Sequence, residues 1–185
     1  GLEKLLMSFG RCRAIEKKGL SALEFHYQKN LKQLKLNISH SKKVNDAGVE
    51  AFAKSIGHNL ENLSYIDINV GLCRKITDRG VQSISENLRC NLEELTLNFE
   101  NCLLITDEAV VFLVKSVGDN LKKLRKLDLN FQGLNQLGDA AVVACAENIT
   151  KMATNLKHLT LNFSGSEKTM DKSILAFIKF FDNDT

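Results

Sequence analysis

Apolar residues alternate with polar ones in five short segments of the chain. These segments are 34–38, 66–70, 95–99, 127–131 and 159–163, and a weaker copy stands at 5–9. Alternation with a period of two residues predicts a strand that buries one face. The fourth position is Asn in each full copy and Ser8 in the weak one, and the successive steps are 29, 32, 29, 32 and 32 residues. Such regular spacing is typical of a solenoid built from stacked repeats.

A helical pattern follows each predicted strand. Apolar residues stand three, six and ten positions after a recurring aspartate, as one stripe of a helix requires. The aspartates are Asp46, Asp78, Asp107, Asp139 and Asp171. We expect each to be a helix N-cap that accepts hydrogen bonds from free backbone N–H groups. We also expect the asparagines near the helix ends, such as Asn59 and Asn120, to stop the helices in the left-handed conformation.

Each repeat is therefore a strand, a loop, a helix and a second loop. The sequence predicts an α/β solenoid of six such repeats, which start near residues 2, 31, 60, 92, 121 and 156 and form one domain over 1–185. Adjacent strands lie about 4.8 Å apart, whereas packed helices need roughly 8–10 Å. The stack should therefore curve, with a parallel sheet on the concave face. The chain begins directly at a repeat, so we expect it to be a segment of a longer array.

The repeat resembles the leucine-rich repeat family, whose pattern is L-x-x-L-x-L-x-x-N/C-x-L. The phrases 73–78 and 102–107 resemble the cysteine-containing subtype common in F-box substrate receptors, and the long helices resemble the ribonuclease-inhibitor subtype. The resemblance implies a right-handed horseshoe that binds other proteins. It also implies that the column of Cys12, Cys73 and Cys102 faces inward as small core residues. A substrate-recognition arm of a ubiquitin ligase is an alternative function.

The polar positions of the strands form the first candidate site, because they point away from the core onto the concave face. They are Lys35, Asn37, Tyr65, Asp67, Asn69, Glu94, Thr96, Asn98, Lys126, Asp128, Asn130, His158, Thr160 and Asn162. This mixed surface suits a protein or peptide, and Tyr65 is the expected anchor. The asparagine column allows two interpretations. It is either a row of amide groups for a partner or a ladder whose amides bond each other.

Basic residues in the loops after the first three strands form the second candidate site. Arg11, Arg13, Lys42, Lys43, Arg74 and Lys75 occupy equivalent positions and should gather on one rim. Such a rim could contact an anion or a nucleic acid. Repeats four to six do not continue it, and the net charge is only +3, so a nucleic acid is not the favoured partner. The alternative is an ordinary solvated loop edge.

Catalytic, metal-binding and membrane-spanning signals are missing from the sequence. It contains no phosphate-binding loop, no HExxH and no Cys–His pair at a recognisable spacing, so we expect neither an enzyme nor a cofactor or metal. The apolar runs are shorter than the roughly 20 residues that a membrane span needs.

Five cysteines without paired spacing do not resemble a secreted disulfide framework. Two glycosylation sequons, at Asn37 and Asn162, fall inside predicted strands. Both features favour an intracellular, cytoplasmic protein. The apolar helix at 174–181 and the leucines near residue 2 predict that both ends are covered by further repeats or by another subunit.

Taken together, the sequence predicts a non-catalytic scaffold that binds a protein on its concave strand surface and forms a subunit of a larger complex.

Overall fold

The computed structural model describes residues 1–23, 25, 28–88, 91–149, 151, 155–169 and 171–182. Cys90 lies outside these residues. Within them the chain alternates strands and helices: β1 (Lys4–Ser8), α1 (Lys17–Ser21), β2 (Gln33–Asn37), α2 (Asp46–Asn59), β3 (Tyr65–Asn69), α3 (Asp78–Asn87), β4 (Glu94–Asn98), α4 (Asp107–Asn120), β5 (Lys126–Asn130), α5 (Asp139–Ile149), β6 (His158–Asn162) and α6 (Asp171–Asp182). The predicted α/β solenoid is confirmed.

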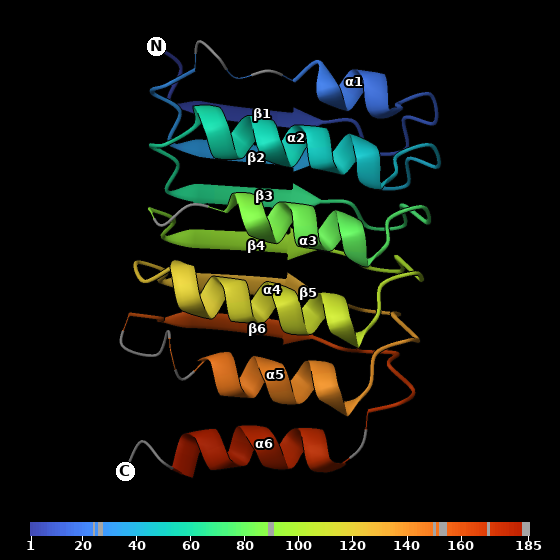
Figure 1. The fold of residues 1–185 in the computed structure, drawn as a ribbon, viewed down its shortest axis with the longest axis vertical. Helices are drawn as coiled ribbons and strands as arrows, with labels where there is room; N and C mark the ends of the chain where they lie inside the picture. The colour runs from blue at the N-terminus through green and yellow to red at the C-terminus, as the bar shows by residue number, and fades with distance from the viewer. Residues whose placement is uncertain are drawn as a thin grey trace.

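The strands form a parallel sheet in chain order, from β1 to β6. The register pairs equivalent positions throughout, so Asn37, Asn69, Asn98, Asn130 and Asn162 lie side by side on neighbouring strands. The helices cover one face of this sheet, and their row extends further than the row of strands (Figure 1). This difference follows from the wider spacing of packed helices and leaves the strands on the inside of the curve.

The core lies between the sheet and the helices. Strand residues such as Leu95 and Leu97 are fully buried, and the helices cover them with residues such as Val110 and Leu113. Each buried side chain of this size stabilises the fold by about 1.5–3 kcal/mol. Aromatic rings that follow the strands stack from one repeat to the next. The ring centroids of Phe99 and Phe131 are 6.0 Å apart.

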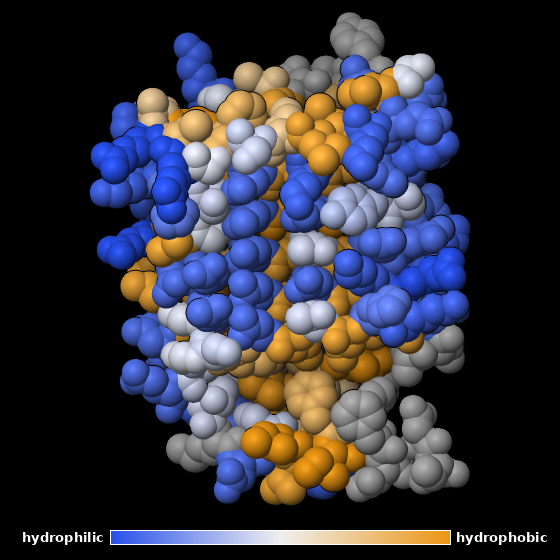
Figure 2. Space-filling model, turned by 180° about the vertical axis from the view of Figure 1, so that it is seen from behind, coloured by the Kyte–Doolittle hydropathy of each residue, from blue (hydrophilic) through white to orange (hydrophobic). Residues whose placement is uncertain are grey.

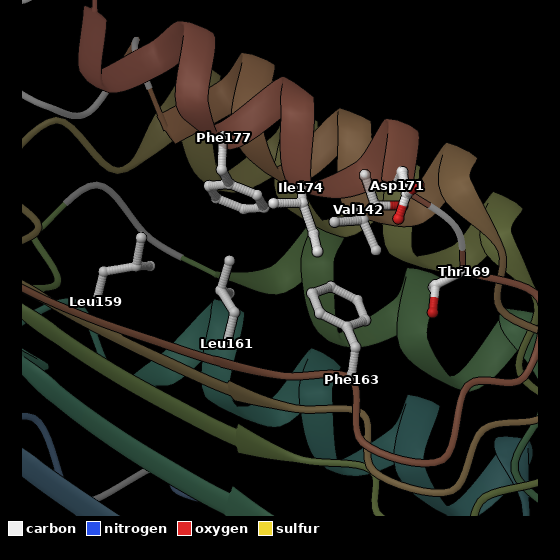
Figure 3. Close-up of a pocket in the computed structure, with 9 residues that line it drawn as sticks. Val142, Leu159, Leu161, Phe163, Thr169, Asp171, Ile174 and Phe177 are labelled. Carbon is white, nitrogen blue, oxygen red and sulfur yellow. The ribbon is translucent and has the colours of Figure 1, made fainter.

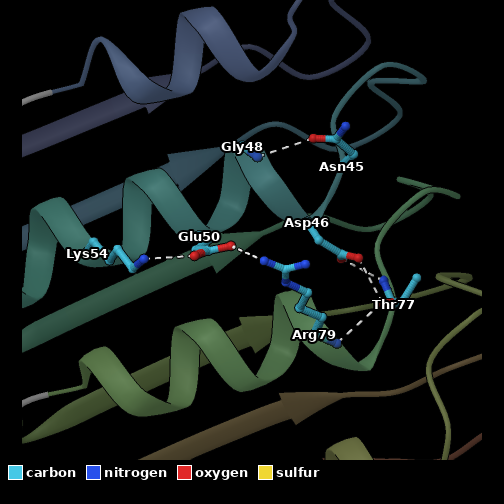
Figure 4. Close-up of polar contacts among 7 residues, drawn as sticks. All are labelled: Asn45, Asp46, Gly48, Glu50, Lys54, Thr77 and Arg79. Atoms are coloured by element: carbon cyan, nitrogen blue, oxygen red, sulfur yellow. Dashed lines mark hydrogen bonds and ion pairs between the residues drawn. The ribbon is translucent and has the colours of Figure 1, made fainter.

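The recurring aspartates do not cap their own helices, and that prediction is wrong for α2, α3 and α4. The preceding residue is the N-cap: the Asn45 side chain accepts from Gly48 N, at 3.2 Å, and Thr77 and Thr106 act in the same way. The carboxylate of Asp46 instead accepts hydrogen bonds from the backbone N and Oγ1 of Thr77, at 2.8 and 2.7 Å (Figure 4). Because the preceding residue already caps the helix, the aspartate carboxylate is left to bond the next repeat.

Asn59 and Asn120 end α2 and α4 without a left-handed backbone, so that expectation was also wrong. In the described residues, positive φ angles occur in the turns after the strands, at Arg11, His40, Leu72 and Asn101. The equivalent positions in the last two repeats are glycines, Gly133 and Gly165, with φ of 72° and 81°. The tight turn after each strand therefore needs the left-handed conformation, which glycine adopts without strain.

Candidate protein-binding surface

The strands carry the concave face, and their polar side chains form rows across it. Viewed from the sheet side, hydrophilic side chains stand one above another over the strands, with hydrophobic ones between the rows (Figure 2). The rows follow from the in-register pairing, which places Lys35 beside Asp67, Thr96 beside Asp128, and Glu94 beside Lys126. The structure therefore brings together the residues that the sequence assigned to this face.

Each asparagine of the row makes the same hydrogen bond. Its Oδ1 accepts the backbone N–H two residues later: Asn37 from Ser39 (3.0 Å), Asn69 from Gly71 (2.9 Å), Asn98 from Glu100 (2.8 Å), Asn130 from Gln132 (3.0 Å) and Asn162 from Ser164 (3.0 Å). These Asx turns end the strands and fix the orientation of every amide.

The amides of this row do not bond each other anywhere in the described part of the chain, so the ladder interpretation is wrong. Asn162 Nδ2 donates to Gln132 Oε1 at 3.4 Å. For Asn37, Asn69, Asn98 and Asn130, the hydrogen bonds of the described residues leave Nδ2 unused. Sequence reasoning missed the Asx turn, although an asparagine placed at a strand end, just before a turn, is the signal for it.

Asp67 lies in a small polar cluster with Lys35 and Tyr65. Lys35 Nζ is 2.6 Å from Asp67 Oδ2, and the Tyr65 hydroxyl donates to the same oxygen at 3.3 Å. Asp67 is only 8% exposed, so its predicted place as an open contact residue is wrong. The carboxylate is engaged by the ion pair with Lys35 and by the hydrogen bond from the Tyr65 hydroxyl. Opposite charges at one position of adjacent repeats were the signal for this pair.

The cluster shifts two pKa values. The hydrogen bond to Asp67, followed by its negative charge, raises the pKa of Lys35 above its ordinary value. Burial raises the pKa of Tyr65, and the Asp67 charge adds to this effect. Both Lys35 and Tyr65 therefore keep their protons at neutral pH. Tyr65 remains half-buried and offers an apolar ring surface, since its hydroxyl already donates to Asp67.

The remaining concave residues differ in exposure along the row. Glu94, Thr96, Lys126 and Asp128 are half-buried, whereas His158 and Thr160 on β6 are exposed. Lys35 is also exposed. The face is therefore polar and accessible from β2 to β6, with its most covered point at Asp67.

The basic rim follows the strands on one side of the sheet. Arg11, Arg13, Lys42, Lys43, Arg74 and Lys75 are all exposed. Lys43 forms an ion pair with Glu16. That hydrogen bond and the charge of Lys43 hold the pKa of Glu16 below its ordinary value, with a smaller contribution from Lys75.

Part of this rim is hollowed. A depression of about 340 Å³ is lined by His40, Lys42, Leu72, Arg74 and Lys75; we call it the rim hollow. The structure therefore brings Lys42, Arg74 and Lys75 together, whereas Arg11, Arg13 and Lys43 do not line this depression.

An apolar pocket of about 520 Å³ lies between β6 and α6; we call it the end pocket. Leu159, Leu161 and Phe163 face it from the sheet side, and Ile174 and Phe177 face it from α6 (Figure 3). These are the core positions of the last repeat. They are accessible because, among the described residues, β6 pairs only with β5. A hydrophobic, orange area lies at the bottom of Figure 2, the end of the molecule at which Figure 1 shows α6.

The cysteine column has two buried members. Cys73 and Cys102 are fully buried, and their Sγ atoms donate to the carbonyls of Ile38 (3.2 Å) and Val70 (3.3 Å) in the preceding repeat. Burial raises the pKa of Cys102 to about 12. Cys12 is exposed, so its predicted place in the core is wrong. The reason is that no strand of the described chain precedes β1 and covers it.

The described residues hold no group of three or more His, Cys, Asp or Glu side chains that is suited to a metal ion. Among the same residues, no helix combines the length and the apolar character needed to cross a membrane.

A comparison with protein families finds the same repeat in part of the chain. A family model described as "Leucine Rich repeat" matches residues 33–53, which cover β2 and the first half of α2. A solved structure described as the crystal structure of the Rad7 and Elc1 complex in yeast contains a similar chain. The match has a TM-score of 0.45 and 14% sequence identity, and it covers 92% of this chain and 51% of that one. This chain thus spans about half the length of its structural neighbour. No curated protein matches the sequence.

Proposed function

We propose that this chain, a leucine-rich repeat protein by its repeat pattern, its sheet and its family match, is a non-catalytic scaffold. Its concave face holds a polypeptide partner, and the chain acts as a subunit of a larger complex. The single observation that carries this proposal is the asparagine row from Asn37 to Asn130, whose amides are fixed by Asx turns.

These amides are preorganised for a partner. Because each Oδ1 is bound to the backbone, the amide is held in one orientation and its Nδ2 donor keeps one direction. A rigid donor loses little conformational entropy when it binds an acceptor, so more of the interaction energy contributes to affinity. Backbone carbonyls of a peptide are acceptors of the required kind.

The surroundings of the row favour a polypeptide over a small molecule. The concave face presents Glu94, Thr96, Lys126 and Asp128 beside the amides, in rows that span several strands. Neither hollow that we describe, the rim hollow or the end pocket, is lined by residues of this central face. A broad polar surface with one half-buried aromatic, Tyr65, resembles the interfaces that proteins form with each other.

The end pocket supports a second contact with protein. Ile174 and Leu175 are 64% and 54% exposed, and exposed apolar patches of this kind commonly mark contact surfaces. Either a further repeat or another subunit would bury them. That residues 1–185 form one domain within a longer array remains a prediction.

Two finer assignments belong to the same proposal. Free buried thiols at Cys73, Cys102 and Cys145 suit a reducing compartment, so we place the protein inside the cell, in the cytoplasm. A role as the recognition arm of a ubiquitin ligase remains a prediction from the phrases 73–78 and 102–107.

The proposal is tested by separating the two roles of one asparagine. Asn98→Asp keeps an oxygen that can accept from Glu100 N, but it removes the N–H donors. The partner is first trapped by a photo-crosslinking side chain at position 96 on the concave face, identified by mass spectrometry and purified. Its affinity is then measured for the wild type and for Asn98→Asp. We expect the variant to bind about tenfold more weakly, as loss of a preorganised hydrogen bond predicts.

The matched control lies on the helix side. Lys115→Ala changes an exposed residue of α4 and should leave the affinity unchanged. A crosslinking group at position 112, which is exposed on the same helix, should not trap the same partner. If position 112 captured the partner as efficiently as position 96, or if Asn98→Asp bound it with wild-type affinity, the concave face would not be the binding surface.

A further inference from the structure

The rim hollow brings three cationic side chains together in one loop region. Lys42, Arg74 and Lys75 are exposed and line one depression, and none of them forms an ion pair with a described residue. Glu16, whose pKa Lys75 helps to lower, is bonded to Lys43. The carboxylates of Asp46 and Asp78 accept hydrogen bonds from Thr77 and Thr106, and among the described residues they form no ion pair with the three cations.

The turns hold these cations in place. His40 and Leu72 have left-handed backbones, with φ of 58° and 62°. Their N–H groups donate to Gly71 O and Glu100 O, at 2.8 and 2.6 Å. These bonds fix each turn to the next repeat, so the bases of Lys42 and Arg74, two residues further on, start from a defined backbone. Only the ends of these side chains must become ordered on binding.

The geometry points to a site for a phosphate monoester, carried by a phosphorylated segment of the protein partner. A phosphate dianion offers three acceptor oxygens, and the planar guanidinium of Arg74 can bind two of them while Lys42 and Lys75 contribute point charges. Three cations without an ion-pair partner among the described residues suit a dianion better than the single charge of an aspartate. A hollow of about 340 Å³ is ample for this group.

The position of the hollow favours a protein over a nucleic acid. His40 and Leu72 lie three residues after Asn37 and Asn69, which end β2 and β3, so the hollow adjoins the proposed concave binding face. A peptide bound near Tyr65 reaches the hollow by extending along the strand direction. A nucleic acid needs a longer track of cations, and the equivalent loop positions carry Leu103, Leu104, Asn135 and Gln136. This inference rests on the proposed function for the peptide, but the phosphate site can be tested without it.

The test is an NMR titration of the full chain with N-acetyl-phosphoserine amide, with N-acetyl-serine amide as the neutral control. We expect amide shifts confined to residues 40–43 and 72–75 with the phosphorylated probe and none with the neutral one. Arg74→Gln should weaken binding about tenfold, as loss of charge-assisted hydrogen bonds predicts. Arg79→Gln, an exposed residue on α3 with the same charge change, should bind like the wild type.

Three outcomes would overturn the inference. Shifts spread over lysines around the whole molecule would show nonspecific charge attraction, as would an equal loss in Arg74→Gln and Arg79→Gln. A ten-nucleotide single-stranded DNA tests the nucleic-acid alternative. If it bound more tightly than the phosphoserine probe and shifted the rim loops of all six repeats, a nucleic acid would be the favoured ligand. The readout is independent of the concave face, because Asn98→Asp should bind phosphoserine normally. Failure at the rim would therefore leave the proposed function intact, and failure at the concave face would leave the rim site intact.

Discussion

The carboxylate of Asp46 in one repeat accepts two hydrogen bonds from Thr77 in the next, one from the backbone N and one from Oγ1. Thr77 is itself the N-cap of α3. The same pair recurs between Asp78 and Thr106, at 2.7 Å for both bonds. The starts of α3 and α4 are therefore each held by the helix start of the preceding repeat. This contact fixes the stacking of the repeats and, through the strand register, the alignment of the concave rows.

Removing one of these links should destabilise the stack. Asp78→Ala leaves Thr106 N and Oγ1 without their acceptor, and the loss of charge-assisted hydrogen bonds should cost about 2 kcal/mol of unfolding free energy. Glu108→Ala is the matched control, because Glu108 is an exposed acidic residue in the first turn of α4. It should cost less than about 0.5 kcal/mol. Urea denaturation measures both, and equal losses would mean that the helix dipole, and not the cross-repeat bond, dominates.

A second prediction concerns Ser41, whose buried Oγ has no hydrogen-bond partner. Cysteine occupies the equivalent position at Cys73 and Cys102, where each Sγ contacts a carbonyl of the preceding repeat. Ser41→Cys should therefore stabilise the protein by about 1 kcal/mol, because a thiol is less costly to bury than an unsatisfied hydroxyl. Thermal denaturation under reducing conditions should show a higher Tm. Ser166→Cys is the contrast, since Ser166 Oγ already donates to Leu134 O at 3.4 Å, and its gain should be smaller.

The structure shows which of its features the sequence could predict. The period-two and helical patterns predicted the sheet, the helices and the concave rows, because both elements bury one face of their own side chains. The Asp46–Thr77 contact, the Asx turns at Asn98 and the burial of Asp67 were not predicted. These depend on which of several polar partners lies within about 3 Å after the repeats stack, and residue spacing within one repeat does not specify that.

The strand register is tested by two neighbouring residues with opposite orientations. Leu97 is fully buried and Thr96 is half-buried on the concave face. Leu97→Asp places a carboxylate in the core and should cost more than about 4 kcal/mol, enough to unfold the adjacent repeats. Thr96→Lys should fold normally, because the added charge stays on the concave face between Asp67 and Asp128. Circular dichroism and hydrogen exchange over β3 to β5 distinguish the two variants, and a folded Leu97→Asp protein would contradict the register.

Thiol reactivity should divide the cysteines by burial. Only the thiolate reacts with iodoacetamide, and burial raises the pKa of both Cys102 and Cys145 to about 12. At pH 8 these two thiols are therefore almost entirely protonated as well as covered, whereas Cys12 is exposed. Peptide mapping by mass spectrometry should show Cys12 modified at least about tenfold faster. Rapid labelling of Cys102 in the native protein would contradict this division and would mean that its repeat opens readily. Added denaturant would then increase the labelling rate only slightly.

The Lys35–Asp67 ion pair predicts an alkaline limit to part of the stability. Asp67 raises the folded-state pKa of Lys35 above its ordinary value of 10.5. The stabilisation from this lysine is therefore fully present below the unfolded pKa and is lost as the pH rises through the folded one. NMR titration of the Lys35 side chain should give a higher pKa in the wild type than in Asp67→Asn. The stability difference between the two proteins should be constant from pH 7 to 9 and should shrink above about pH 10.5. An unchanged difference at pH 11 would show that the Tyr65 hydrogen bond, and not the Lys35 charge, accounts for the contribution of Asp67.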